Sequence, residues 1–338
     1  MHQNRHLFIE TILEKCRSKA SVIGLPESDD PRVLNATVAL LKNKAVSSVV
    51  LFGDKQRILE VASKNSIDLS SVHESVVWVQ HRYADIEEKV ADSYIKYLKS
   101  KHKVIDESLV QSYSRSFLAQ SGYLLSKGDL DAVVAGCVYT TGEVIKSAIG
   151  TVGLAEGIKT VSGSFLLHRA DDNRTCIFAD SAVVIDPSIE QLVDIAASTV
   201  ESWKSIQSEI PPKVAFLSFS TKGSARHPHV EKISKAALLF KEKYPDIIAE
   251  GELQFDAAIV PEIASRKCPD SNWDGRANCF IFPDLNSGNI AYKIAQRFAG
   301  FQAWGPFLQG VAKPFCDLSR GASAEEIYAT ALINLIRS

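Results

Sequence analysis

The stretch QGVAKPFCDLSRGASAEEI, residues 309–327, concentrates charged and hydroxyl side chains close to the carboxyl end of the chain. It holds two cations, Lys313 and Arg320, and the hydroxyls of Ser319 and Ser323. Apolar residues then recur at spacings of three and four, which predicts a helix that runs to the end of the chain. Ser319 and Arg320 are therefore expected just before a helix N-terminus, where the helix dipole and free N–H groups favour an anion.

Two residues of this stretch each admit two interpretations. Glu326 follows Ser323 by three residues, the spacing of a capping box, so its carboxylate can simply complete a helix cap. A carboxylate beside an anion site can also move a proton. For Arg320, the alternative to binding an anion is a salt bridge at the protein surface. The local pattern leaves both questions open.

The composition of the whole chain is that of an ordinary globular protein. Its 338 residues include 46% hydrophobic and 23% charged side chains, with a formal net charge of −2. This length favours two domains. The charge balance argues against binding to nucleic-acid backbones or anionic membranes, although a local phosphate site needs only a few cations. No apolar run approaches the roughly 20 residues that span a bilayer, and no signal-peptide core precedes the first charges.

Cysteine and histidine usage predicts neither disulfides nor a metal site. The six cysteines are scattered without CxxC pairs, and the eight histidines form no HExxH motif. This pattern is typical of reduced thiols. We therefore expect a cytoplasmic protein that binds no metal.

Alternating apolar and amphipathic segments in the first half predict an α/β fold with parallel strands and helices on both faces. The segment 86–126 has helical periodicity and is expected to hold two helices. Strands are expected at 21–25, 46–52, 76–79 and 131–137, and helices at 7–16, 33–41, 56–63 and 141–148.

A hydroxyl-rich turn, VYTTGE, follows the strand expected at 131–137. Strand, turn and helix start together form the kind of junction at which α/β folds bind ligands. Thr140 and Glu143 also have capping-box spacing. By itself, the local pattern favours plain N-capping over ligand binding for Thr140 and Thr141.

The pattern changes between residues 150 and 185, where glycines interrupt helices. Segments 164–168 and 175–179 are expected to pair as antiparallel strands, which indicates a second domain beginning near residue 155. Ser188 and Gln191 have the spacing of a third capping box. Three further strand-to-helix junctions are expected, with strands at 214–218, 257–260 and 277–282.

Several common motifs are missing from these junctions. STKGSA at 220–225 has the composition of a phosphate-binding turn but lacks the P-loop pattern. No GxGxxG follows the first strand, and no GxSxG is present. ATP and dinucleotide binding therefore lose their main support.

Six segments of the chain carry a further signal, namely STKGSA (220–225), GELQFDAA (251–258), FPDLNSGNIAYK (282–293), GP (305–306), QGVAKP (309–314) and DLSRG (317–321). Through these segments nearly the whole chain resembles the phosphate acetyltransferase/phosphate butyryltransferase family, in which they occur in the same order. They look more like the acetyl branch of that family.

The resemblance implies a two-domain isocitrate/isopropylmalate-dehydrogenase-like fold, with parallel and mixed sheets and an active-site cleft between the domains. The first domain is expected to comprise 1–155 and 309–338. The second, 156–308, is expected to form a homodimer. The implied substrates are CoA or acetyl-CoA and phosphate or acetyl phosphate. CoA serves as substrate, and no cofactor or metal is expected.

The family's catalytic residues align with Ser319, Arg320 and Glu326. Arg320 would hold the phosphoryl group, because a guanidinium fork suits two oxygens. Ser319 would hydrogen-bond the CoA sulfur or the developing oxyanion. Glu326 stands where the family has an aspartate as general base, so its carboxylate reaches one methylene further.

Other positions align with the family's substrate-binding residues. Thr140 and Thr141 match its hydroxyl-rich substrate loop, and Lys293 matches a contact to CoA. Lys146 replaces a family arginine, and a second arginine falls on Lys99 or Ser100. Lysine keeps the charge but loses the bidentate fork. Lys313 is counted with the substrate-binding cations.

The implied activity is phosphate acetyltransferase, by direct thiolate attack in a ternary complex. One alternative is phosphate butyryltransferase or another short-chain phosphate acyltransferase. The other is a non-catalytic module that senses acyl-CoA or acetyl phosphate.

Overall fold

The computed structural model describes residues 2–337, apart from the side chains of residues 2–6 and 81. The chain divides into two compact units. The terminal unit comprises residues 6–155 and 311–338, and the middle unit comprises 156–310 together with the first residues of the chain.

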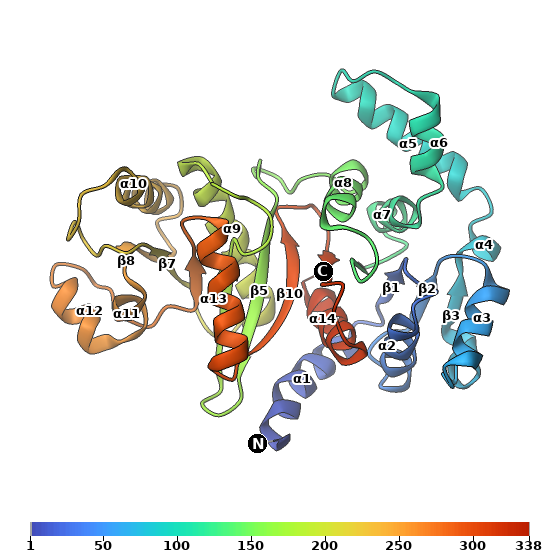
Figure 1. Ribbon diagram of the computed structural model, residues 1–338, viewed down its shortest axis with the longest axis horizontal. Coiled ribbons are helices and arrows are strands. Elements are labelled where there is room, and N and C mark those ends of the chain that lie inside the picture. Colours follow the sequence, from blue (N-terminus) through green and yellow to red (C-terminus); the bar gives the residue numbers. More distant parts are fainter. Residues whose placement is uncertain (1, 338) are drawn as a thin grey trace. The chain divides into compact units, whose positions relative to one another are not determined.

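A parallel sheet forms the centre of the terminal unit, in the order β3–β2–β1–β4–β11 (Figure 1). β4 is buried along its whole length, as expected for a strand covered on both faces. The four strands expected at 21–25, 46–52, 76–79 and 131–137 are confirmed in somewhat shorter form, and β11 is a further strand that was not predicted. The bounds are β1 Val22–Leu25, β2 Ser48–Leu51, β3 Val76–Trp78, β4 Ala132–Ala135 and β11 Phe315–Asp317.

Helices follow the strands of the terminal unit. Pro31 begins α2 directly after the cap residue Asp30, and the Asn334 amide of α14 donates to the Val133 carbonyl of β4 at 3.1 Å. A short 3₁₀ helix spans Ser70–Ser75. The α-helices are α1 His2–Arg17, α2 Pro31–Lys42, α3 Lys55–Lys64, α4 Val79–Arg82, α5 Ile86–Ser100, α6 Glu107–Ser114, α7 Phe117–Lys127, α8 Thr141–Thr151 and α14 Ala324–Ile336.

The prediction of two helices within 86–126 was wrong, because three helices occupy this segment. Asp106 caps α6 by accepting from two backbone N–H groups, so a new helix starts after the lysine-rich turn. α5 and α6 stand beside the rest of the unit (Figure 1). They share a small core in which the rings of Tyr94 and Tyr113 stack with their centroids 3.8 Å apart.

The middle unit is built on a mixed sheet in the order β10–β5–β6–β9–β7–β8. β5 pairs antiparallel with both β10 and β6, which confirms the predicted strand pair, and the remaining neighbours are parallel. Strand bounds are β5 Ser162–Arg169, β6 Arg174–Ala179, β7 Lys213–Leu217, β8 Ile248–Leu253, β9 Cys279–Ile281 and β10 Gln302–Gln309.

Successive side chains of β5 point to opposite faces of this sheet, and each face is covered by helices. Phe165 stacks on Tyr292 of α13 at 3.8 Å. Ser162 points the other way and shares the Gln309 side chain with Thr199 of α9. The helices are α9 Ile189–Ile206, α10 Pro228–Lys243, α11 Phe255–Ile259, α12 Pro261–Lys267 and α13 Leu285–Phe298.

The strand predicted at 257–260 was wrong. These residues belong to α11 and its C-cap, and the strand β8 lies just before them at Ile248–Leu253. Ala257 and Ala258 are fully buried, because their small side chains let a short helix pack closely on the core of the unit. An apolar run of four residues does not distinguish a strand from a helical turn.

None of the described helices is both long and apolar enough to cross a membrane.

Candidate active site

Three loops meet at one edge of the terminal sheet. β1, β4 and β11 are parallel neighbours, so their carboxyl ends lie side by side. Each strand leads through a short loop to the N-cap of a helix. These loops are 26–30 before α2, 136–140 before α8 and 318–323 before α14.

The loop after β11, which carries Ser319 and Arg320, is a tight turn. The Ala322 N–H donates to the Ser319 carbonyl at 2.9 Å, and the Gly321 N–H donates to the Ser319 hydroxyl oxygen at 3.3 Å. Both Ser319 and Arg320 are exposed. No acceptor in the described part of the chain takes the Ser319 hydroxyl proton, so this proton is free for a ligand.

The Arg320 guanidinium acts on carboxyls of the two neighbouring elements. Hydrogen bonds from the Thr140 hydroxyl and backbone lower the pKa of Glu143, and the charge of Arg320 lowers it further. Burial raises the pKa of Asp317, at the end of β11, to about 6, and the nearby Glu27 also raises it. The Thr141 hydroxyl and Arg320 oppose that rise. Arg320 therefore places positive charge at the start of α8 and the end of β11.

Two of the predicted capping boxes lie at this edge, and both are confirmed. The Ser323 N–H donates to Glu326 Oε2 at 2.8 Å, and the Glu326 N–H donates to the Ser323 hydroxyl at 3.1 Å. Thr140 and Glu143 form the equivalent box on α8. Thr140 therefore has the capping role that its local pattern favours, and Glu326 has the capping role that was one of its two interpretations. Glu326 Oε1 has no hydrogen-bond partner among the described residues.

Glu27, which the sequence reasoning missed, holds the loop before α8. Its carboxylate is buried and accepts from the backbone N–H groups of residues 136–139 at 2.7–3.1 Å. It also lies 2.8 Å from the Cys137 thiol. A buried carboxylate needs such donors to offset its loss of water. Its signal in the sequence is an acidic residue placed directly after the first apolar strand.

Gly136 allows the loops after β4 and β11 to approach each other. A Cβ at this position would lie 2.4 Å from Asp317 Oδ1 and 2.5 Å from the Leu318 backbone nitrogen. Its φ of +106° is also a conformation that favours glycine. Asp317 is 2% exposed, and its Oδ1 has no hydrogen-bond partner among the described residues.

The remaining predicted residues are dispersed. Lys146 is exposed on α8, the helix that Thr140 caps. Lys313 precedes β11, and its Nζ lies 3.9 Å from a Cβ built at Gly128, which precedes β4. Lys313 is thus at the amino edge of the strands, opposite the loop of Ser319. Lys99 and Ser100 are exposed at the end of α5, and Lys293 lies on α13 of the middle unit.

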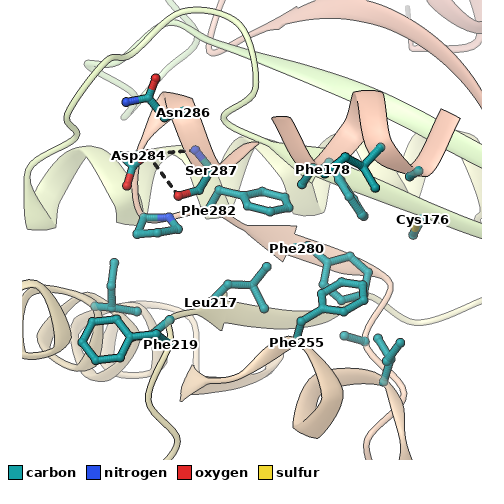
Figure 2. A pocket seen from close by; sticks show the side chains of 18 of the residues that line it. Cys176, Phe178, Leu217, Phe219, Phe255, Phe280, Phe282, Asp284, Asn286 and Ser287 are labelled. Carbon is teal, nitrogen blue, oxygen red and sulfur yellow. Dashed lines mark hydrogen bonds between the residues drawn. The ribbon is translucent and has the colours of Figure 1, made fainter. Parts of the chain in front are cut away.

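The middle unit contains a cavity of about 1040 Å³, and none of the predicted site residues lines it. Figure 2 shows Phe178, Phe280 and Phe255 on one side of this cavity and Phe219 on another. Nearby, the backbone N–H and the hydroxyl of Ser287 donate hydrogen bonds to the Asp284 carboxylate. Its lining is mainly apolar but includes the cations Arg169, Arg174, Lys232 and Arg276.

Comparisons with known proteins identify a family for the whole chain. The family model described as "Phosphate acetyl/butaryl transferase" matches residues 7–335. The chain is 38% identical to the phosphate acetyltransferase of Bacillus subtilis (strain 168) over 327 residues, covering 96% of each chain. It is also 38% identical to the phosphate acetyltransferase of Acetivibrio thermocellus over 335 residues, covering 98% of each.

Solved structures show the same relationship. A phosphotransacetylase from Streptococcus pyogenes superposes with a TM-score of 0.88 at 36% identity, covering 98% of each chain. A dehydrogenase structure from Salmonella typhimurium, described as a 4-hydroxythreonine-4-phosphate dehydrogenase, is 10% identical with a TM-score of 0.56 and shares the fold alone. The dehydrogenase-like fold expected from the sequence is therefore confirmed. From the full-length family match and these relatives, the chain belongs to the phosphate acetyl/butyryl transferase family.

Proposed function

We propose that this chain is a phosphate acetyltransferase, which transfers acetyl reversibly between CoA and phosphate: acetyl-CoA + phosphate = CoA + acetyl phosphate. The observation that carries the proposal is the exposed Ser319–Arg320 turn ahead of α14, with an unused hydroxyl proton and a cation. The relatives named phosphate acetyltransferase support the acetyl reaction over its butyryl counterpart.

In this mechanism Arg320 binds the phosphoryl group of acetyl phosphate through its guanidinium fork. The CoA thiol, with an ordinary pKa of about 8.5, gives its proton to a carboxylate and becomes the stronger nucleophile. The thiolate attacks the acetyl carbonyl, and Ser319 donates a hydrogen bond to the developing oxyanion. The C–S bond forms, the C–O bond to phosphate breaks, and phosphate leaves with the electron pair, held by Arg320.

Glu326 is our proposed base. Its Oε2 is used by the helix cap, whereas Oε1 has no partner within the described part of the chain. One carboxylate can therefore hold the cap with one oxygen and accept a proton with the other. Asp317, with its raised pKa, lies deeper and is 2% exposed, so the substrate thiol would have less access to it.

The substrate-binding roles remain proposals too. Thr141 and Arg320 both act on the Asp317 carboxyl, so Thr141 is suited to the acyl phosphate, whereas Thr140 acts mainly as a cap. Lys146 and Lys293 are exposed cations suited to the phosphates of CoA. Lys313 lies at the amino edge of the strands, opposite the loop that carries Ser319 and Arg320.

We also propose a homodimer formed through the middle unit. Ile290, Ile294 and Phe298 recur every four residues on α13 and are 56%, 53% and 90% exposed, so they form an apolar stripe. A second copy of the chain would cover this stripe. Sedimentation velocity of the purified chain tests the proposal, and a monomer at micromolar concentration would contradict it. A cytoplasmic location is supported by six free, buried cysteines.

The test of function is phosphate-dependent loss of acetyl-CoA, followed as release of the free CoA thiol. Comparing acetyl-, propionyl- and butyryl-CoA separates the acetyl from the butyryl reaction, since each methylene is worth about 1–3 kcal/mol in a pocket. Binding of CoA by calorimetry without turnover of any of these substrates would instead select the sensing module.

A further inference from the structure

Arg32, in the first turn of α2, uses every N–H donor of its guanidinium. Nε and Nη2 donate to the two carboxylate oxygens of Asp30 at 3.0 and 2.7 Å. Nη1 donates to the carbonyls of Arg320 and Ala322 at 2.7 and 2.9 Å. Nη2 also donates to the Cys137 carbonyl at 3.1 Å. A guanidinium has five N–H groups in a planar fork, and here all five are bound.

Asp30 holds Arg32 in this orientation. It is the N-cap of α2, and its Oδ1 also accepts from the backbone N–H of Arg32 at 2.8 Å. The side chains of Asp30 and Arg32 are only 14% and 33% exposed. Asp30 therefore fixes the guanidinium at the start of α2, in the orientation in which it bonds to the other two loops.

The bonds from Nη1 fix the main chain on both sides of Gly321, in the turn that carries Ser319 and Arg320. The bond to Cys137 fixes the loop that leads to Thr140, and Glu27 binds the N–H side of that same loop. The carbonyls of both site loops are thus held by Arg32 of α2, and the N–H groups of one of them by Glu27 of the loop after β1. The exposed side chain of Arg320 is left free for a ligand.

We propose that Arg32 is a positioning residue for acyl transfer, which holds the Ser319–Arg320 turn in register with the loop that leads to Thr140. This inference rests on the proposed phosphate acetyltransferase activity. It predicts an effect on turnover, because a displacement of about 1 Å in a site can cost about 10²-fold in rate. A residue that served stability alone would change the fraction of folded protein and leave the turnover of the folded protein intact.

Arg32→Lys separates these two roles. Lysine keeps the charge, but its single ammonium cannot bind the Asp30 carboxylate and three carbonyls at once. We expect kcat to fall about 100-fold, with KM for acetyl phosphate and CoA within about threefold of wild type and little change in melting temperature. The matched control is Arg57→Lys. Arg57 pairs with Asp29, in the loop between β1 and α2, at 2.8 Å, but its side chain is 70% exposed. This variant should keep the wild-type kcat.

A second variant covers the case in which the fold depends on the bonds of Arg32. Arg32→Ala should be slower still, and added guanidinium ion at non-denaturing concentration should restore part of its kcat while leaving Arg57→Ala unchanged. Wild-type kcat in Arg32→Lys, or losses in both Arg32 variants that only follow the folded fraction, would overturn the positioning role and leave the proposed activity standing. An inactive wild type would overturn both.

Discussion

Glu326 caps α14 in the structure, and in the proposed mechanism it is also the general base. Glutamine at this position can still complete the capping box, because its side-chain oxygen accepts the same Ser323 N–H. It cannot accept a proton from a thiol. We expect Glu326→Gln to keep a melting temperature near wild type and to lower kcat by about 10²–10⁴-fold, the usual contribution of a general base.

The control for this variant is Ser323→Ala, which removes the hydroxyl of the cap but keeps the carboxylate. It should lose about 1 kcal/mol of stability and retain most of its kcat. Full activity in Glu326→Gln would assign Glu326 to the cap alone.

Asp317 makes stability depend on pH in a way that one substitution isolates. Its pKa in the folded protein is about 6, against 3.8 for the ordinary side chain, so folding favours the protonated form. The stability from this group is complete below pH 3.8 and is lost as pH rises through about 6. Asp317→Asn stays neutral. Its stability relative to wild type should rise across this window by up to about 3 kcal/mol and then level off.

Thermal unfolding of both proteins from pH 4 to pH 8 measures that difference. Glu250, whose pKa is lowered to about 2 by its lysine and serine partners despite its burial, is ionised throughout this range in both proteins. It therefore cancels in the comparison. A difference in melting temperature that does not change with pH would contradict the raised pKa of Asp317.

Single residues were predictable where their role depends on near neighbours in the chain. All three capping boxes follow from a spacing of three residues and are present in the structure. Glu27 and Arg32 were missed, because the loop groups that they hold lie over 100 residues away in the chain. Only the pairing of β1, β4 and β11 brings those partners within reach.

At the scale of elements, the close approach of the loops after β4 and β11 depends on one glycine. Gly136→Ala would place a methyl group against Asp317 and the backbone of Leu318, at a φ that alanine rarely adopts. We expect a loss of at least about 1–3 kcal/mol in stability and a lower kcat, because the turn carrying Ser319 must shift.

Gly142→Ala is the control for that substitution. Gly142 lies in the first turn of α8, and apart from its chain neighbours and the backbone of its own helix a Cβ there meets no described atom within 4 Å. Its stability should lie within about 1 kcal/mol of wild type. Equal melting temperatures and equal kcat values for the two variants would show that the close approach of the loops after β4 and β11 is needed neither for stability nor for turnover.

Elements were predictable where their periodicity is long or their ends are marked. The antiparallel pair β5–β6 followed from two apolar runs around a polar turn. Residues 257–260 were mistaken for a strand because the run is short and apolar, and burial of Ala257 and Ala258 against the core decides its conformation. Within 86–126 the apolar period continues through the helix breaks, so the caps at Asp106 and Ser116 had to be recognised to count the helices.

For the whole molecule, the ordered motifs of the sequence indicate the function more strongly than any one local pattern does. Local chemistry could place an anion site before the last helix, but Ser319 and Arg320 acquired specific roles only through the family resemblance. The structure adds why they can act together. Arg32 donates hydrogen bonds to the turn that carries them, and Arg32 and Glu27 both bind the neighbouring loop. The Ser319 hydroxyl and the Arg320 guanidinium therefore project from a fixed backbone.

The turnover of Arg320→Ala with acetyl phosphate and CoA measures whether Arg320 binds the transferred phosphoryl group. Arg320 is exposed, and its carbonyl, not its side chain, makes the bond to Arg32, so the variant should keep a melting temperature near wild type. We predict that kcat/KM for acetyl phosphate falls by at least about 10³-fold. A kcat/KM within a few-fold of wild type, in a folded protein, would show that Arg320 does not bind the phosphoryl group.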